Sequence, residues 1–177
     1  ACLAKYDQHK DKIVANSVMR QLVHEFLNAG FDVIPVSNSK EVALRQNLEV
    51  TGYPLNRFPF TVSKDDVVAA GRQVKPSPDP YCYALAKYNA MHWPNSQYAL
   101  TPKDCLVFED SEKGVQASIA ARMLTIHILD DTGKLDTTHL EKREADYHPV
   151  AMRSLESFVR YRMPRLQHRQ TLQPGAQ

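Results

Sequence analysis

The chain has 177 residues, of which 43% are hydrophobic and 24% are charged, and its formal net charge is +2. This length gives room for one domain with a sizeable core, and the composition is typical of a globular protein. The small net charge favours no particular class of partner, and no apolar run approaches the roughly 20 residues of a membrane-spanning helix, which argues against a membrane protein.

The three cysteines, Cys2, Cys82 and Cys105, are odd in number and lack CxxC spacing. This usage predicts reduced thiols rather than a disulfide framework or a zinc site, with Cys105 as a buried, inert thiol. We therefore expect the protein in a reducing intracellular compartment, either the cytoplasm or the mitochondrial matrix.

Three regions follow one another along the chain. Residues 1–15 are polar and rich in lysine, residues 16–158 carry the pattern of a folded core, and residues 159–177 are basic and lack apolar periodicity. We expect this last region to be an extended tail, with four arginines that contact RNA or an acidic protein surface: Arg160, Arg162, Arg165 and Arg169. Because the first residue is Ala1 and not Met, we expect a processed form or a piece of a longer chain.

The first half of the core begins with an amphipathic helix. Apolar residues recur at helical spacing over residues 16–28 and end before Gly30, which predicts a helix that packs on a sheet. Four shorter elements are predicted after it: a strand over residues 31–36, a helix over 40–51, a strand over 58–62 and a solvated turn over 65–67.

The second half of the core continues with a helix over residues 81–90, whose Leu85 and Ala86 are predicted to face inward. Residues 92–96 form an irregular surface insertion. The later elements are a strand over residues 105–108, a helix over 115–121, a strand over 123–129, a turn over 130–133, a short strand over 145–147 and a closing helix over 150–158.

Two adjacent carboxylates, Glu109 and Asp110, follow the strand over residues 105–108. At the carboxyl end of a strand in an open α/β sheet, such carboxylates face the ligand crevice and are suited to a hard cation such as Mg²⁺. The alternative is that Asp110 or Ser111 caps the next helix, as these residue types often do. The pair alone does not decide between the two.

Two further stretches bear on this choice. Ser37 and Asn38 follow the strand over residues 31–36, and Lys75 lies in a proline-rich stretch just ahead of the helix that starts near Tyr81. A hydroxyl, a lysine and a carboxylate pair, each at a strand end or a helix start, form a constellation suited to phosphate and magnesium.

These stretches resemble three motifs of the haloacid-dehalogenase (HAD) superfamily of phosphohydrolases, in its β-phosphoglucomutase and phosphoglycolate-phosphatase-like branch. Residues 36–38 resemble the second motif, residues 75–79 the third, and residues 107–111 with the following Gly114 the fourth. The resemblance spans residues 16–158. It implies an α/β fold with a Rossmann-like, three-layer core around a parallel sheet.

The resemblance also implies roles for individual residues. Asp110 would ligate Mg²⁺, and Glu109 would assist it or hold a metal-bound water. Lys75 would bridge the nucleophile and the phosphate, while Ser37 and the backbone of Asn38 would bind phosphate oxygens. In the family an aspartate attacks phosphorus, and the resulting aspartyl-phosphate is then hydrolysed.

The family's first motif, an apolar strand that ends in Asp-x-Asp-Gly-Thr, is absent. Asp7 and Asp11 do not replace it, because no buried strand leads into either. The sheet would then lack its central nucleophile strand, leaving two inner strands about 9–10 Å apart unless another segment fills the slot or the strands close up. The cap domain is missing as well. Arg122, where the family has glycine, would occupy a left-handed position at the end of a helix.

Two interpretations remain open, and with them the question whether the chain is an enzyme. It is either the core of a Mg²⁺-dependent phosphohydrolase or phosphomutase, inactive alone and completed by a missing N-terminal segment or a partner protein, or a non-catalytic pseudoenzyme. The second would be a structural subunit of a larger assembly, such as a mitochondrial ribosome or respiratory complex. A nucleotide-binding domain is disfavoured, because no glycine-rich loop follows any predicted strand.

Overall fold

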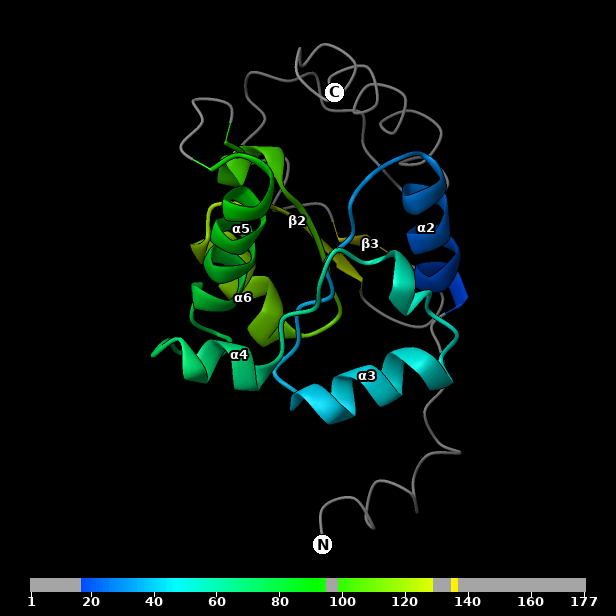
Figure 1. Ribbon diagram of the computed structural model, residues 1–177, viewed down its shortest axis with the longest axis horizontal. Coiled ribbons are helices and arrows are strands. Elements are labelled where there is room, and N and C mark those ends of the chain that lie inside the picture. The colour runs from blue at the N-terminus through cyan, green and yellow to red at the C-terminus, as the bar shows by residue number, and fades with distance from the viewer. Residues whose placement is uncertain (1–16, 95–98, 129–134, 137–177) are drawn as a thin grey trace, which may run out of the picture.

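The computed structural model describes residues 17–94, 99–128 and 135–136. Helices come first along this part of the chain, and the strands follow near its end, where β1 and β2 flank α6 (Figure 1). The elements are α2 (Ser17–Asn28), α3 (Glu41–Val50), the 3-10 turn η2 (Leu55–Arg57), α4 (Lys64–Ala69), α5 (Asp79–His92), the 3-10 turn η3 (Pro102–Asp104), β1 (Leu106–Glu109), α6 (Glu112–Ala120), β2 (Leu124–Ile128) and β3 (Leu135–Asp136).

The described strands form one small mixed sheet with the order β1-β2-β3. Strands β1 and β2 are parallel and joined through α6, with Leu106 opposite Leu124 and Glu109 opposite His127. Strand β3 runs antiparallel to β2. The predicted α/β fold with a parallel sheet is therefore confirmed.

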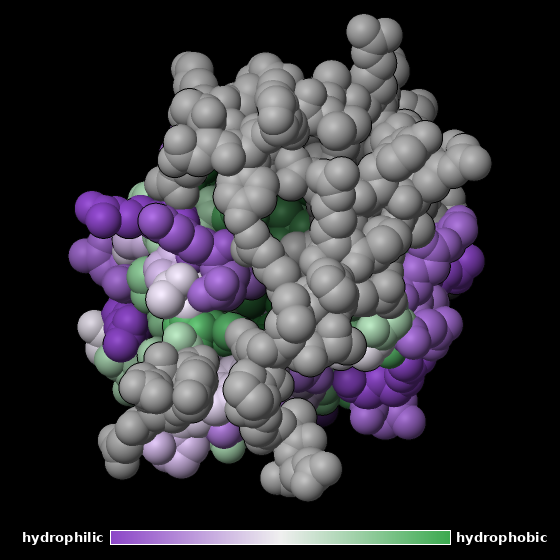
Figure 2. Space-filling model, turned by 90° about the horizontal axis from the view of Figure 1, so that it is seen from above, coloured by the Kyte–Doolittle hydropathy of each residue, from purple (hydrophilic) through white to green (hydrophobic). Residues whose placement is uncertain are grey.

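Helices cover both faces of the parallel pair. Leu22 and Phe26 of α2 pack with Ile126 on one face, and Tyr81 of α5 packs with Val107 on the other, together with α6. Figure 1 shows α2 on one side of β2 and α5 with α6 on the opposite side. From above, hydrophobic side chains are visible towards the middle of the molecule, with hydrophilic ones at both sides (Figure 2). The result is a three-layer arrangement.

The predicted strands over residues 31–36 and 58–62 are reduced to one parallel bridge between Val36 and Val62. The bridge consists of the Val62 N–H bond to the Pro35 carbonyl at 2.8 Å and the Ser37 N–H bond to the Val62 carbonyl at 2.9 Å. Pro35 and Pro59 each lack the N–H group that a longer ladder requires. The predicted strands were therefore too long.

Two local predictions are wrong. Residues 65–67 lie in helix α4 and not in a turn, because Ser63 and Asp66 form a reciprocal capping box at its start. Val67 is consequently buried. In α5, Ala86 is exposed, whereas Leu85 packs on the core as predicted, and the buried residues are Pro80, Tyr81 and Ala84. The inward face of α5 therefore includes Leu85 but not Ala86.

Several predicted features lie outside the described residues. They are the segment 1–15 with Asp7 and Asp11, the turn over 130–133, the strand over 145–147, the helix over 150–158, and the tail over 159–177 with Arg160, Arg162, Arg165 and Arg169. The predicted insertion over 92–96 is described as far as Pro94. Among the described helices, none is both long enough and apolar enough to cross a membrane.

Arg122 has the left-handed backbone conformation that was expected of it, with a φ of +62°. It follows α6, and its N–H group donates to the Ile119 carbonyl at 2.9 Å, while the Met123 N–H donates to the Ser118 carbonyl at 3.1 Å. Only glycine adopts this conformation without a steric penalty from Cβ. The turn between α6 and β2 is therefore strained at Arg122.

Replacement of this residue by glycine should relieve the strain. We expect Arg122→Gly to raise the free energy of unfolding by up to about 1 kcal/mol in urea denaturation. Arg122→Ala removes the same exposed side chain but keeps Cβ, so it should give no such gain. Equal stability of the glycine and alanine variants would show that the left-handed conformation is not the cause.

Cys105 is half-buried just before β1, and its thiol donates to the Thr101 carbonyl at 3.6 Å. Burial, followed by the nearby charge of Asp104, raises the pKa of the Cys105 thiol to about 11. The thiolate is the reactive form, so this thiol is inert near neutral pH. The structure agrees with the inert thiol predicted for Cys105, although the side chain is only partly buried.

Alkylation of Cys105 by iodoacetamide should therefore depend steeply on pH. Because the thiol stays protonated, we expect the rate, followed by peptide mass spectrometry, to rise about tenfold per pH unit from pH 8 to 10. A rate that levels off near pH 8.5, the behaviour of an ordinary thiol, would contradict the raised pKa.

Candidate functional site

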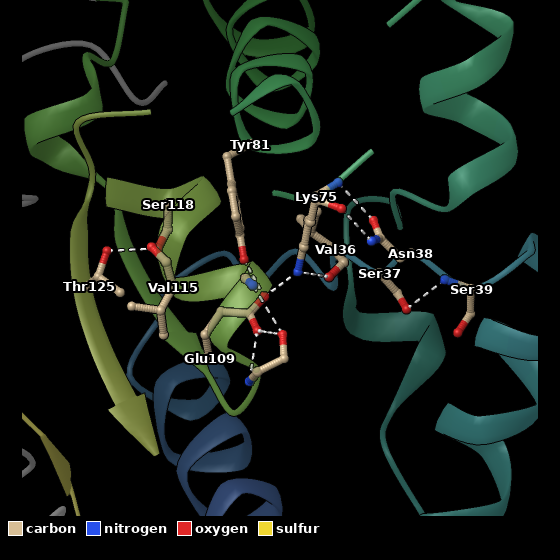
Figure 3. A network of polar contacts seen from close by, with 12 residues as sticks. Val36, Ser37, Asn38, Ser39, Lys75, Tyr81, Glu109, Val115, Ser118 and Thr125 are labelled. Atoms are coloured by element: carbon tan, nitrogen blue, oxygen red, sulfur yellow. Dashed lines mark hydrogen bonds and ion pairs between the residues drawn. The ribbon is translucent and has the colours of Figure 1, made fainter. Parts of the chain in front are cut away.

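Three segments that are distant in sequence converge at the carboxyl end of β1. They are the end of β1 with Glu109, the loop after Val36, and the stretch around Lys75 that leads into α5 (Figure 3). All five residues singled out in the sequence lie on these segments: Ser37, Asn38, Lys75, Glu109 and Asp110. The structure thus brings together the parts of the predicted constellation.

The centre of the site is an ion pair between the Lys75 ammonium and the Glu109 carboxylate. Both residues are only 7% exposed. The ammonium also donates to the Val36 carbonyl at 2.9 Å, so the Lys75 side chain spans from the 31–36 segment to β1. In the described part of the chain no backbone hydrogen bond joins these two segments, and the Lys75 side chain is the polar contact between them.

Tyr81 is a second partner of Glu109. Its hydroxyl donates to the carboxylate oxygen that Lys75 also contacts, and its ring centroid lies 4.8 Å from the Lys75 ammonium. Burial, followed by the charge of Glu109 and the hydrogen bond to it, raises the pKa of Tyr81 well above its usual range. Tyr81 is therefore a hydrogen-bond donor to Glu109 at any physiological pH.

Ser111 and Gly114 close the other side of the Glu109 carboxylate. The Ser111 hydroxyl donates to the second carboxylate oxygen at 3.0 Å and accepts from the Gly114 N–H at 3.1 Å. Ser111 is thus the residue that caps α6, and the alternative that Asp110 caps it is wrong. A Cβ atom on Gly114 would lie 2.0 Å from the Glu109 carboxylate, so the carboxylate packs directly on the helix backbone.

Asn38 holds the backbone of Lys75 in place. Its side-chain amide donates to the Lys75 carbonyl and its oxygen accepts from the Lys75 N–H, each at 3.0 Å. The Ser37 hydroxyl accepts from the Ser39 N–H at 3.1 Å, and the Ser37 N–H belongs to the bridge with Val62. Asn38 therefore lies against Lys75, and Ser37 follows Val36, whose carbonyl accepts from the Lys75 ammonium.

Asp110 is exposed at the end of β1. The pKa of Tyr53 is raised, chiefly by burial. The nearby charge of Arg20 lowers this pKa, and the smaller influence of the Asp110 charge raises it. No group of three acidic, histidine or cysteine side chains suited to a metal ion occurs among the described residues. Since both Glu109 oxygens are already bonded, the described residues do not by themselves fit a magnesium site.

Sequence reasoning missed Tyr81, Ser111 as a Glu109 partner, and the side chain of Asn38. Tyr81 follows Lys75 in the chain and lies in the first turn of α5, and its aromatic character pointed equally well to an ordinary core residue. Its hydroxyl is what distinguishes it, because a buried phenol requires a hydrogen-bond partner. The available signal in the sequence was a tyrosine at the helix start that follows the lysine motif.

Comparisons with known proteins give partial likenesses. No family model matches the chain. A stretch of 108 residues, 61% of the chain, is 33% identical to Protein SUPPRESSOR OF QUENCHING 1, chloroplastic, of Arabidopsis thaliana, and spans 9% of that protein.

Two solved structures show a similar arrangement over part of their length. A HAD-superfamily hydrolase of subfamily IA from Geobacter sulfurreducens has a TM-score of 0.48 at 16% identity, with 61% of this chain and 47% of that chain covered. The HAD hydrolase YfnB of Bacillus subtilis, solved bound to magnesium, has a TM-score of 0.45 at 18% identity, with 59% and 41% covered.

The close packing of Glu109 on Gly114 leads to a prediction. An alanine in a helix is usually more stable than a glycine by about 1 kcal/mol, but Gly114→Ala should instead lower the free energy of unfolding by about 1–3 kcal/mol, because the new methyl group displaces the carboxylate. Chemical denaturation measures this change.

The matched control is the same substitution without the carboxylate. In a Glu109→Ala background, Gly114→Ala has nothing to displace and should be neutral or stabilising. If Gly114→Ala lowered the free energy of unfolding equally in the wild-type and Glu109→Ala backgrounds, contact with the Glu109 carboxylate would not be the cause.

Proposed function

We propose that the chain is the core of a HAD-like phosphohydrolase or phosphomutase, of the β-phosphoglucomutase and phosphoglycolate-phosphatase-like branch, and that it is inactive alone. The observation that carries this proposal is the buried Lys75–Glu109 pair at the meeting point of two strand ends. A buried ion pair contributes little to stability compared with apolar side chains, so its presence favours a functional role.

In the proposed site Lys75 neutralises a phosphate and the attacking carboxylate, and Ser37 with the Asn38 backbone binds phosphate oxygens. The two hydrogen bonds from Asn38 to the Lys75 backbone support this role, because they fix the lysine relative to the loop that would hold the phosphate. Asp110, with Glu109, would hold magnesium only in a completed site.

The nucleophile is proposed to come from a segment that completes the sheet between residues 31–36 and β1. Lys75 is the connection between these two segments, which is consistent with an open slot for an additional strand. The segment would belong to a longer form of this chain or to a partner protein. The chain spans only 9% of the curated relative, so the activity of a complete protein is part of the proposal.

A second candidate is a non-catalytic pseudoenzyme that serves as a structural subunit of a larger assembly. The observation in its favour is that both oxygens of Glu109 are engaged, by Lys75 and Tyr81 on one side and by Ser111 on the other. A carboxylate held in this way stabilises the contact between α5, α6 and β1 without any ligand.

The proposal also includes the cellular compartment of the protein and the binding partner of residues 159–177. The curated relative is named chloroplastic. We therefore add the plastid to the reducing compartments, cytoplasm and mitochondrial matrix, expected from the cysteines. RNA or an acidic protein remains the proposed contact of Arg160, Arg162, Arg165 and Arg169.

The proposal is tested with p-nitrophenyl phosphate. The purified 177-residue chain should show no turnover above the buffer rate, with or without magnesium, because it has no nucleophile strand. Natively purified protein, with its intact mass and partners determined, should hydrolyse the substrate if a segment bearing Asp-x-Asp is present, and Lys75→Ala should then remove that activity.

Lys113→Ala is the control, because Lys113 is an exposed lysine on α6. It should leave the activity of the native assembly unchanged. Turnover by the isolated chain that Lys75→Ala abolishes would contradict the absence of a nucleophile. A stable native assembly with no such segment and no turnover would favour the structural subunit.

A further inference from the structure

The Glu109 carboxylate is surrounded on all sides by groups of the protein. One oxygen accepts from the Lys75 ammonium and the Tyr81 hydroxyl, and the other accepts from the Ser111 hydroxyl at 3.0 Å and lies 3.5 Å from the Ser111 N–H. The backbone of Gly114 blocks movement of the carboxylate towards α6. Figure 3 shows Lys75 and Tyr81 pointing towards Glu109 from two different segments.

The Lys75 ammonium is the positive charge that balances the Glu109 carboxylate in this cluster. It donates to the carboxylate, donates also to the Val36 carbonyl at 2.9 Å, and lies 4.8 Å from the centre of the Tyr81 ring. Carboxylate oxygen, carbonyl oxygen and an aromatic face are all groups that stabilise positive charge. Lys75 and Glu109 therefore compensate each other's charge inside the protein.

A divalent cation competes for the same carboxylate. Mg²⁺ requires close, nearly octahedral oxygen ligands. A carboxylate that accepts from the Lys75 ammonium, the Tyr81 hydroxyl, and the Ser111 hydroxyl and N–H has no free lone pair directed at such an ion. The neighbouring Asp110 is a single exposed carboxylate. Two positive charges beside one buried carboxylate also repel each other.

We infer that Lys75 is an internal cation that keeps Glu109 closed to metal ions in this chain. Metal binding at Glu109 then requires that Lys75 move to another anion, such as a carboxylate on the segment that completes the sheet. Lys75 thus regulates the site that the proposed function uses, and in that respect its role rests on the proposed function. The closed state itself follows from contacts within this chain.

Titration of the purified 177-residue chain with Mn²⁺, followed by electron paramagnetic resonance, tests this role without any substrate. The wild-type chain should show no saturable binding up to about 1 mM Mn²⁺. Lys75→Met frees the Glu109 carboxylate and should bind Mn²⁺ at least about tenfold more tightly. Lys75→Met combined with Glu109→Gln should lose that gain.

Lys113→Met is the matched control, since it removes one exposed lysine charge from the same region and leaves the Glu109 contacts intact. It should behave as the wild type. An equal gain in Lys113→Met, or a gain in Lys75→Met that survives Glu109→Gln, would overturn the role of Lys75, because the effect would then be one of net charge alone.

The wild-type titration decides the question even if Lys75→Met fails to fold. Saturable Mn²⁺ binding by the wild-type chain below about 1 mM that Glu109→Gln abolishes would show that the carboxylate is open, and would overturn the inference. Lys75→Gln, which keeps a donor for the Val36 carbonyl, is the second neutral variant. Failure of the native assembly to hydrolyse phosphate esters would refute the proposed function and leave these metal titrations unchanged.

Discussion

The contact on which the site depends is the buried ion pair between Lys75 and Glu109. Removing two charges from water costs several kcal/mol each, and only good geometry with additional hydrogen bonds compensates that cost. The Val36 carbonyl supplies such a bond to Lys75, and Tyr81 supplies one to Glu109. One pair therefore ties together the end of β1, the loop after residues 31–36 and the start of α5.

The surroundings of this pair account for otherwise ordinary residues. Glycine is usually unfavourable in a helix. Gly114 nevertheless suits its position in α6, because any Cβ there would collide with the Glu109 carboxylate. Ser111 both caps α6 and contacts Glu109, so the start of this helix and the carboxylate are positioned by one hydroxyl. Asn38 plays the corresponding part for Lys75 by bonding to both polar groups of its backbone.

The enzyme and structural-subunit interpretations differ in what lies between residues 31–36 and β1. Residues 31–36 and β1 are covered by the same helix, α2, through Phe31, Leu106 and Phe108. Among the residues that the structure describes, Lys75 is the one whose side chain bonds to polar groups of both segments. A strand inserted there would give the Val36 carbonyl a backbone partner and release the ammonium. The structure shows Lys75 paired with Glu109, whereas in the proposed enzyme Lys75 would pair with the inserted segment.

The sequence by itself determined the elements whose signals are local. The apolar spacing of α2, the strand-helix-strand unit from β1 to β2, and the strained Arg122 were all predictable, and the unusual residues Lys75, Glu109 and Asp110 stood out. Only the tertiary structure decided that Pro35 limits its segment to one bridge, and that Glu109 meets Lys75 and Tyr81 across 34 and 28 residues. The reason is physical: periodicity records which face of one element is apolar, whereas the partner of a buried charge depends on how distant elements pack.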